Sequence, residues 1–182
     1  ARPAYFDQVG REVRSAHEAA ALFDQSTFGK IDVVGKDACA ALNRLCANQM
    51  DRSPGRVVYT SMLNERGGIE SDLTAIRLAP EHYRLYVGTG SVRRDLAWIR
   101  RHCEAFAVSV TDVTEAYAVI AVMGPGGREV LASVGGEGVD DIGFFQSDDR
   151  HLGDHRVRAA KVSYVGEDLS LIHISEPTRP NE

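Results

Sequence analysis

The stretch Tyr59–Leu73, YTSMLNERGGIESDL, decides the fold of this chain. Two segments with the residue pattern of strands, Val57–Leu63 and Ile69–Leu78, flank the turn sequence Asn64–Gly68, which ends in two glycines. Turn-forming residues between two such segments are typical of a β-hairpin. The sequence therefore predicts two antiparallel strands joined by a tight turn.

One carboxylate of this hairpin, Asp72, is a candidate for chemistry. Side chains alternate along a strand, so Asp72 shares a face with Glu70 and Thr74, opposite Ser71 and Leu73. The pattern alone favours a face in contact with solvent. If the face instead lines a cleft, Asp72 is placed to exchange a proton with a nitrogen base there.

On both sides of the hairpin, runs of strand-like sequence are separated by single helical segments. Apolar residues at helical spacing predict three helices, at Glu12–Phe23, at Ala38–Asn48 with Asp37 as its cap, and at Val92–His102. A shorter helix of about eight residues is expected after the glycine-rich turn 124–127. Further strands are predicted at Lys30–Val34, Tyr83–Val87, Val108–Val113, Ala118–Val122 and Val157–Tyr164. This order favours an α+β fold with antiparallel sheets over a parallel, doubly wound sheet.

The composition is that of an ordinary globular protein. The 182 residues carry a formal net charge of −5, so we expect no nucleic-acid partner, and no segment approaches the ~20 apolar residues that span a bilayer. The three cysteines, Cys39, Cys46 and Cys103, lack CxxC spacing and suit buried, reduced thiols, with Cys46 in the core. We expect a reducing compartment, which is the cytoplasm, or the mitochondrial matrix in a eukaryote.

Three other patterns suggest chemistry, and each has a simpler interpretation. The glycine-rich turns 88–90 and 124–127 precede helices, but neither matches a phosphate-binding fingerprint, so we interpret both as turns. His151 and His155, near Asp148 and Asp149, could hold a divalent metal, but a solvated loop explains them as well, and we expect no metal. No serine or cysteine stands in a recognised nucleophile motif.

The end of the chain, from Leu169, reads LSLIHISEPTR and resembles the in-frame translation of a common transposase sequencing adapter. We therefore predict a native domain over residues 1–168 and a foreign tail over residues 169–182. The alternative is a genuine strand followed by a tail that contains proline.

Three segments carry a resemblance to a known family: MLNERGGIESDL, VMGPGGREVL and the interrupted SYVGED. Together they resemble the folate-dependent aminomethyltransferases, the glycine-cleavage T-protein and its relatives. The resemblance implies a tetrahydrofolate-binding α+β domain in which Asp72 acts near the reacting folate nitrogens. It also implies that Tyr164 packs on the pterin, and that the folate pocket is lined by Met62, Leu63, Val87 and Gly90.

The opening segments Arg2–Phe6 and Phe23–Lys30 look most like the carboxy-terminal half of dimethylglycine and sarcosine dehydrogenases. In that group an upstream flavin domain with FAD oxidises a methylated amine to an iminium, and the folate domain captures the carbon as 5,10-methylenetetrahydrofolate. The resemblance implies that this chain holds only the folate-binding half. Its partners would be folate, the iminium and the upstream flavin domain.

The sequence departs from the family in two places. T-proteins have an asparagine near the position of Gly90, and the glutamate that holds the amino edge of the pterin falls at Leu171, within the foreign tail. We therefore expect the fragment itself to be inactive. The alternatives are a stand-alone glycine-cleavage aminomethyltransferase and a non-catalytic folate-binding scaffold of the type that assists iron–sulfur cluster assembly.

Overall fold

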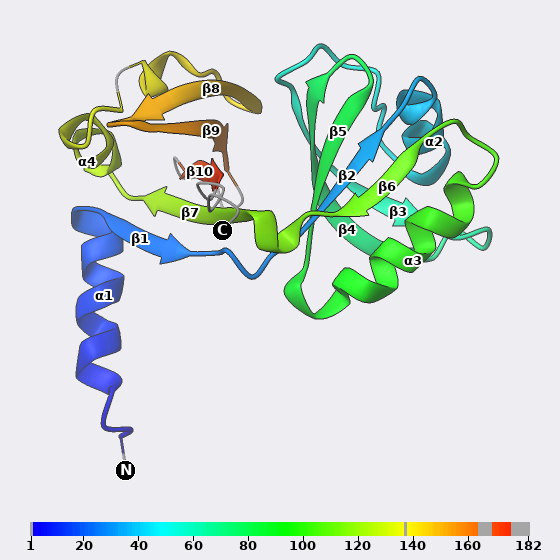
Figure 1. Cartoon of the computed structure of the whole chain (residues 1–182). Coiled ribbons are helices and arrows are strands. Elements are labelled where there is room, and N and C mark those ends of the chain that lie inside the picture. Colours follow the sequence, from blue (N-terminus) through cyan, green and yellow to red (C-terminus); the bar gives the residue numbers. More distant parts are fainter. Residues whose placement is uncertain (1, 137, 164–168, 176–182) are drawn as a thin grey trace, which may run out of the picture. The chain divides into compact units, whose positions relative to one another are not determined.

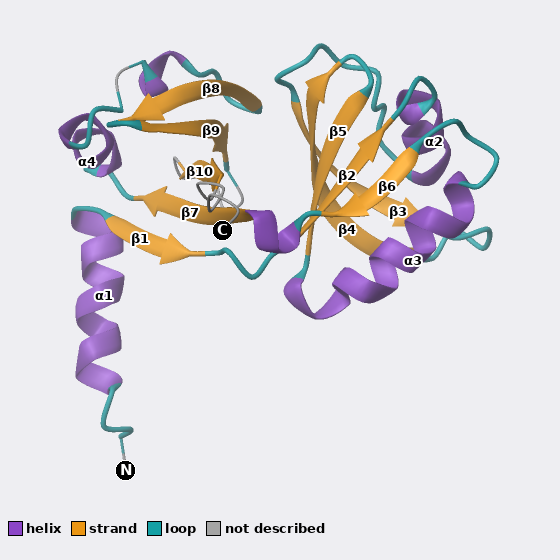
Figure 2. Ribbon diagram, viewed as in Figure 1, coloured by secondary structure: helices purple, strands orange, loops and turns teal. Residues whose placement is uncertain are grey.

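The computed structural model describes residues 2–136, 138–163 and 169–175, and these form two compact units. One unit combines residues 1–25 with residues 118–182, and the other is the continuous segment 26–117. Each unit is built on its own five-stranded sheet (Figures 1 and 2). Helices and antiparallel strands occur in both units, which confirms the predicted α+β class.

The sheet of residues 26–117 has the strand order β3-β4-β5-β2-β6. Its strands are β2 (Gly29–Val34), β3 (Val57–Leu63), β4 (Ile69–Ala79), β5 (His82–Val87) and β6 (Ser109–Asp112). All neighbours in this sheet are antiparallel. The predicted strands in this region are confirmed, with ends that differ by a few residues.

The predicted hairpin is the pair β3–β4. Val57 pairs with Ile76 and Ser61 with Asp72, and the register shifts by one residue between Met62 and Leu63. In the turn, the Asn64 side-chain oxygen accepts hydrogen bonds from the backbone N–H groups of Arg66 and Gly68. Gly67 has φ of +77°, a conformation that glycine adopts without steric cost, which explains why a glycine lies there.

Two helices pack on one face of this sheet, α2 (Ala38–Leu45) and α3 (Val92–Cys103). Apolar residues of both helices join Ile31, Leu73 and Leu85 in one core, because the helical and strand periodicities each turn one apolar face inward. Cys46 and Cys103 are buried in this core as free thiols, as expected for Cys46.

Helix α2 ends earlier than the predicted Asn48. Cys46 already has an extended backbone and forms an isolated antiparallel bridge with Met62, and the Ala47 N–H donates to the Ser61 carbonyl. Pairing with β3 therefore replaces the last helical turn. Asp37 is the N-cap residue, but its carboxylate accepts from the backbone N–H of Ala107 instead of from the helix.

The other unit contains the sheet β1-β7-β10-β9-β8. Its elements are α1 (Phe6–Glu18), β1 (Ala21–Asp24), β7 (Tyr117–Met123), α4 (Gly127–Ser133), β8 (Gln146–Leu152), β9 (His155–Val162) and β10 (Leu169–Ser175). Short 3-10 turns, η1 (Thr89–Ser91), η2 (Thr114–Ala116) and η3 (Val139–Asp141), complete the described elements of the chain. Val122, Leu131 and Val157 are among the residues of its core.

The prediction of a helix over Glu12–Phe23 is wrong at both ends. The helix begins at Phe6, and Ala21–Asp24 form a strand whose partner is β7, with Leu22 opposite Val122. The chain leaves the helix where the Ala19 carbonyl accepts from the Gly126 N–H at 2.7 Å, so tertiary pairing overrides the helical propensity of the alanines. None of the residues of α1 is buried.

The interpretation of residues 151–155 as a loop is also wrong. His151 and Leu152 end β8 and His155 begins β9, with Leu152 opposite His155, and only Gly153 and Asp154 form the turn between the strands. β9 pairs on its other side with β10, from Leu169 opposite Val162 to Ile174 opposite Val157. Backbone pairing of this kind does not depend on the origin of the sequence, so the assignment of residues 169–182 to a foreign tail stays a prediction.

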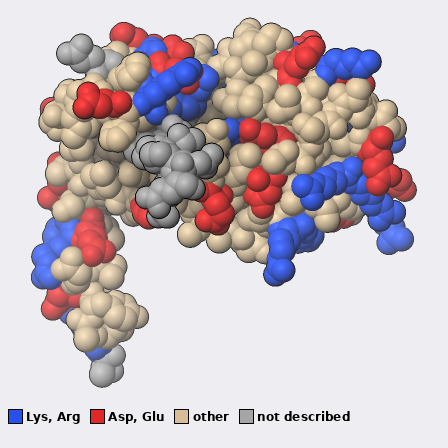
Figure 3. Space-filling view, viewed as in Figure 1, with Lys and Arg blue, Asp and Glu red and all other residues tan. Residues whose placement is uncertain are grey.

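No helix in the described part of the chain is long and apolar enough to cross a membrane. On the face shown in Figure 3, acidic and basic side chains are intermixed.

Candidate functional site

The sheet of residues 26–117 brings the predicted site residues to one of its ends. Leu73 pairs with Val87 across β4 and β5, so Asp72 lies opposite Gly88, and Asp72 also pairs with Ser61 of β3. Met62 pairs with Ser71, the neighbour of Asp72. The end of β3, the start of β4 and the turn after β5 therefore lie next to one another. These segments contain Met62, Leu63, Asp72, Val87 and Gly90.

Asp72 is exposed at this end of the sheet. Its Oδ2 accepts a hydrogen bond from the Tyr59 hydroxyl at 2.9 Å, and Tyr59 itself is 49% exposed. Among the described residues, the Asp72 carboxylate has no second hydrogen-bond partner. One carboxylate oxygen is thus fixed by the protein, and the other is open to a donor from outside.

The remaining candidates differ in exposure. Met62 and Val87 are buried in the helix-covered core, 0% and 2% exposed, whereas Leu63 beyond the register shift is 39% exposed. Gly90 lies in η1, and a Cβ atom added there would have no other atom within 4 Å. Tyr164 lies outside the described residues. Asp72, Leu63 and Gly90 are therefore accessible, while Met62 and Val87 support the backbone from beneath.

Sequence reasoning missed Tyr59 as the partner of Asp72. Tyr59 pairs with Thr74, two residues from Asp72, so the two side chains lie diagonally on one face of the hairpin. The sequence could have predicted this contact, because a turn over residues 64–68 determines which positions of the two strands are neighbours.

Sequence reasoning also missed Asp95 of α3, whose carboxylate is buried at 1% exposure. Its Oδ2 accepts from the Ser71 hydroxyl at 2.7 Å and from the Ser91 hydroxyl at 2.6 Å. Its Oδ1 accepts from Arg94 Nε at 3.2 Å. A polar residue in the first turn of a helix usually faces solvent, so the sequence carried no signal for this contact.

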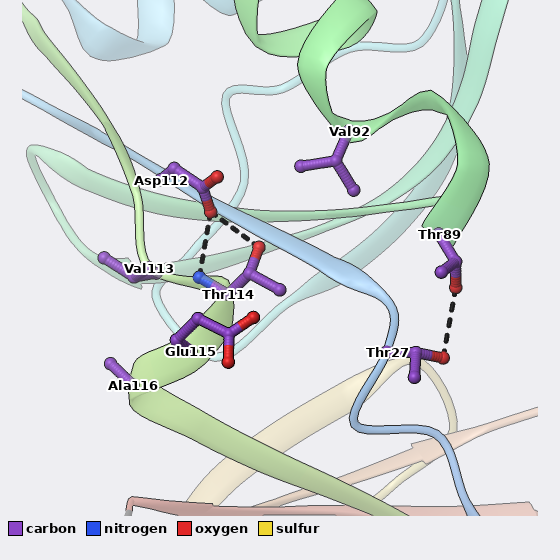
Figure 4. A pocket seen from close by; sticks show the side chains of 8 residues that line it. All are labelled: Thr27, Thr89, Val92, Asp112, Val113, Thr114, Glu115 and Ala116. Carbon is purple, nitrogen blue, oxygen red and sulfur yellow. Dashed lines mark hydrogen bonds between the residues drawn. The ribbon is translucent and has the colours of Figure 1, made fainter.

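The same unit has a hollow of about 660 Å³ that Thr89 of η1 helps to line (Figure 4). Its lining residues come from the segment before β2, from η1, from the start of α3, and from the end of β6 through η2: Thr27, Thr89, Val92, Asp112, Val113, Thr114, Glu115 and Ala116. Asp112 accepts from the Thr114 hydroxyl at 2.6 Å, and the Thr89 hydroxyl donates to Thr27 at 3.2 Å. None of the predicted site residues that the structure describes lines this hollow.

The ion pair of Asp32 and Arg84 is a second polar cluster in the same unit. Arg84 Nε donates to Asp32 Oδ1 at 2.7 Å and Arg84 Nη2 to Oδ2 at 2.9 Å, while His82 Nε2 lies 2.9 Å from Oδ2. Burial raises the pKa of Asp32, but the hydrogen bonds from Arg84 and His82 outweigh burial and hold it below its ordinary value. The guanidinium also lies 3.7 Å from the centre of the Tyr117 ring. The cluster joins β2, β5 and Tyr117 within this unit.

The histidine and aspartate candidates for a metal do not converge in the described part of the chain, where no group of three potential ligands occurs. Asp148 is paired with Arg150, and Asp149 with Arg156 and Arg158.

A profile of the GCVT N-terminal domain family matches residues 1–176 of this chain. Two similar curated proteins are the aminomethyltransferases of Thermotoga neapolitana and Lysinibacillus sphaericus, 32% and 33% identical over 91% of this chain. The aligned region is 46% of each relative, so the chain spans about half the length of the curated relatives it matches.

Solved structures give the same result. The glycine cleavage system aminomethyltransferase T from Bartonella henselae superimposes with a TM-score of 0.81 at 27% identity, over 91% of this chain and 44% of that one. Heterotetrameric sarcosine oxidase from Corynebacterium sp. U-96 shares the fold, with a TM-score of 0.65 at 15% identity over 94% of this chain and 86% of that one. Because the profile match covers nearly the whole sequence, this chain belongs to the GCVT N-terminal domain family.

Proposed function

We propose that this chain is the tetrahydrofolate-binding part of an enzyme that transfers a one-carbon unit to folate, with Asp72 as the residue that handles the proton. Family membership and relatives named aminomethyltransferase support the reaction class. The observation that carries the proposal is the exposed Asp72 carboxylate, with one oxygen bound by Tyr59 and the other open, opposite the turn that begins at Gly88.

The described residues at this end of the sheet fit a flat, amine-bearing ligand. Asp72 offers a carboxylate acceptor, Leu63 offers exposed apolar surface, and Gly90 leaves open space where a side chain would otherwise project. Tetrahydrofolate supplies the two amine nitrogens that the transferred carbon joins as a methylene bridge. Tyr164 is proposed to pack against its pterin ring, as the family resemblance implies.

Asp72 has two tasks in this proposal. Its open oxygen accepts a hydrogen bond from the reacting amine and so orients the nitrogen toward the incoming carbon. The same oxygen takes up the proton that the nitrogen loses as the new C–N bond forms, which is general-base catalysis. Tyr59 keeps the carboxylate in one orientation through its hydrogen bond at 2.9 Å.

We infer that the parent protein is a flavin-dependent demethylating dehydrogenase of the dimethylglycine or sarcosine type. Support comes from the opening segments Arg2–Phe6 and Phe23–Lys30 and from a glycine at position 90. An upstream domain would bind FAD and deliver the iminium of a methylated amine to the folate site. The free thiols of Cys46 and Cys103 support a reducing compartment, the cytoplasm or the mitochondrial matrix.

A stand-alone aminomethyltransferase is the second candidate. It is favoured by the similarity to the Bartonella henselae aminomethyltransferase T at a TM-score of 0.81. The full-length protein distinguishes the two candidates, because only a dehydrogenase reduces a flavin when a methylated amine is added.

Binding is tested on the chain itself by titrating the ¹⁵N-labelled protein with tetrahydrofolate and following backbone amide shifts by NMR. We expect shifts at residues 72 and 88–90, and a higher tetrahydrofolate concentration for the same shifts in Asp72→Asn. Glu115→Gln, an exposed carboxylate in the hollow of the same unit, is the matched control and should bind as the parent does. Shifts confined to residues 112–116, or abolished by Glu115→Gln, would move the site to the hollow.

Catalysis is tested in a full-length protein that carries this segment. Asp72→Asn should reduce formation of 5,10-methylenetetrahydrofolate by about 10²–10⁴-fold, the usual contribution of a general base, while amine oxidation continues. Equal amounts of folate product from variant and parent would exclude the proposed role of Asp72.

A further inference from the structure

We propose that Asp95 is a positioning residue that holds the strand carrying Asp72 and the turn carrying Gly90 in a fixed relation. This inference rests on the proposed function, since it concerns the same site. It starts from a buried carboxylate, 1% exposed, that the proposed chemistry does not use.

Both serine contacts of Asp95 lead to residues beside the site. Ser71 directly precedes Asp72 in β4, and its hydroxyl lies 2.7 Å from Asp95 Oδ2 and 3.2 Å from the Asp72 carbonyl oxygen. Ser91 directly follows Gly90, and its hydroxyl lies 2.6 Å from the same Oδ2 and 3.0 Å from the Gly88 carbonyl oxygen. A single carboxylate oxygen therefore joins the two backbone segments that form the site.

Arg94, the neighbour of Asp95 in the first turn of α3, also contacts β4 beside Asp72. Arg94 Nη2 donates to the Glu70 carbonyl at 2.9 Å, and Arg94 Nε donates to Asp95 Oδ1 at 3.2 Å. The first turn of α3 thus contacts residues 70 and 71 of β4 from one side of the sheet. Asp72 points to the opposite side, because side chains alternate along the strand, so Asp95 fixes its backbone without contacting its carboxylate.

Burial makes these contacts directional. A carboxylate that is shielded from water must be satisfied by the protein, and two hydroxyls that converge on one oxygen restrict where both serines can lie. Displacement of a catalytic group by about 1 Å can cost roughly 10²-fold in rate. The hydrogen bonds of Asp95 to Ser71 and Ser91, here called the Asp95 clamp, therefore affect the rate by fixing the position of Asp72.

The test uses backbone amide shifts and hydrogen exchange of the ¹⁵N-labelled chain without ligand. Ser71→Ala should perturb and deprotect the amide of Asp72, Ser91→Ala that of Gly90, and Asp95→Leu both. Asp95→Asn keeps one acceptor oxygen of the same size and should restore most of the parent pattern. Ile99→Val, one turn further along α3 and equally buried, is the control for a general loss of packing.

If these variants change the amides of Asp72 and Gly90 no more than Ile99→Val does, the inference is wrong. The two serine variants keep this test available if Asp95→Leu does not fold. Amide shifts and exchange rates in Asp95→Asn that match those in Asp95→Leu would also contradict the inference. The acceptor oxygen that Asp95→Asn retains would then not be what holds the two serines.

Tetrahydrofolate binding is a second measurement, and it connects the Asp95 clamp to the proposed function. Asp95→Leu should weaken tetrahydrofolate binding by about 10-fold or more, and its effect should be non-additive with that of Asp72→Asn. Additive effects of the two substitutions would contradict coupling through Asp72. A parent chain that shows no tetrahydrofolate shifts would overturn the proposed function, and the ligand-free amide data would still decide the role of Asp95.

Discussion

Tyr59 and Asp72 form a hydrogen bond at the surface. Its removal should change ligand binding more than the free energy of unfolding. Tyr59→Phe keeps the ring and deletes the hydroxyl that donates to Asp72 at 2.9 Å. We expect a loss of about 1 kcal/mol or less in the free energy of unfolding, measured by urea denaturation. Tetrahydrofolate binding should weaken more than this, because Asp72 loses its fixed orientation. A variant that binds as tightly as the parent would remove Tyr59 from the site.

The three cysteines differ in environment and should differ in reactivity. Burial raises the pKa of Cys46 to about 12, with a further contribution from Cys103, and burial raises the pKa of Cys103 to about 11. The thiolate is the nucleophile, so both residues should resist iodoacetamide at pH 8 while half-buried Cys39 reacts. Peptide mass spectrometry before and after denaturation measures the order. Equal labelling of all three in the folded chain would contradict the buried core.

At the scale of elements, the contact between β2 and β5 includes the ion pair of Asp32 with Arg84. The Arg84 side chain is 7% exposed and that of Asp32 is 12% exposed, so neither charge is well solvated. Asp32→Asn should destabilise the protein by about 3–5 kcal/mol at pH 7, because it leaves a buried guanidinium without its counter-charge. The pair of Asp51 with Arg77 provides the control, because the Asp51 side chain is 69% exposed, and Asp51→Asn should cost about 1 kcal/mol or less.

The same pair gives the protein a pH dependence of defined sign. The pKa of Asp32 is lower in the folded state, so its contribution is fully present above the ordinary carboxyl pKa of about 4 and is lost as the pH falls through the folded-state value. Unfolding free energies measured between pH 7 and pH 2 should therefore converge for the parent and Asp32→Asn at the acid end. A constant difference in unfolding free energy between the parent and Asp32→Asn at every pH would show that protonation of Asp32 is not linked to folding.

Local pattern was sufficient for the hairpin and for helix α3, since alternation and helical periodicity reflect burial directly. It failed for α1, where alanine-rich sequence favours a helix but Leu22 and its neighbours pair with β7. At the site, Asp72 is a proposal that rests on family resemblance in the sequence. The sequence could not show that Gly88 lies opposite Asp72 or that Asp95 reaches Ser71, because both contacts depend on strand register and helix docking.

At the scale of the whole molecule, residues 26–117 form a continuous unit with its own core of both helices and all five strands. A segment limited to these residues should fold alone, because α2 and α3, which cover one face of its sheet, lie within the segment. We expect a single cooperative urea transition and dispersed NMR amide signals. A segment that lacks both would show that the core depends on residues outside it.

The division into units also has a consequence for synthesis on the ribosome. β1 is made before residues 26–117 and its partner β7 after them, yet Phe23 pairs with Ala121 and the Gln25 N–H donates to the Val119 carbonyl at 2.8 Å. At about 5–20 residues per second, β1 waits roughly 5–20 s for that partner, longer than most small domains need to fold. The unit of residues 26–117 can therefore complete its core while β1 is the only strand of the other sheet that has been made. The later pairing of β1 with β7 then brings the two ends of that finished unit together.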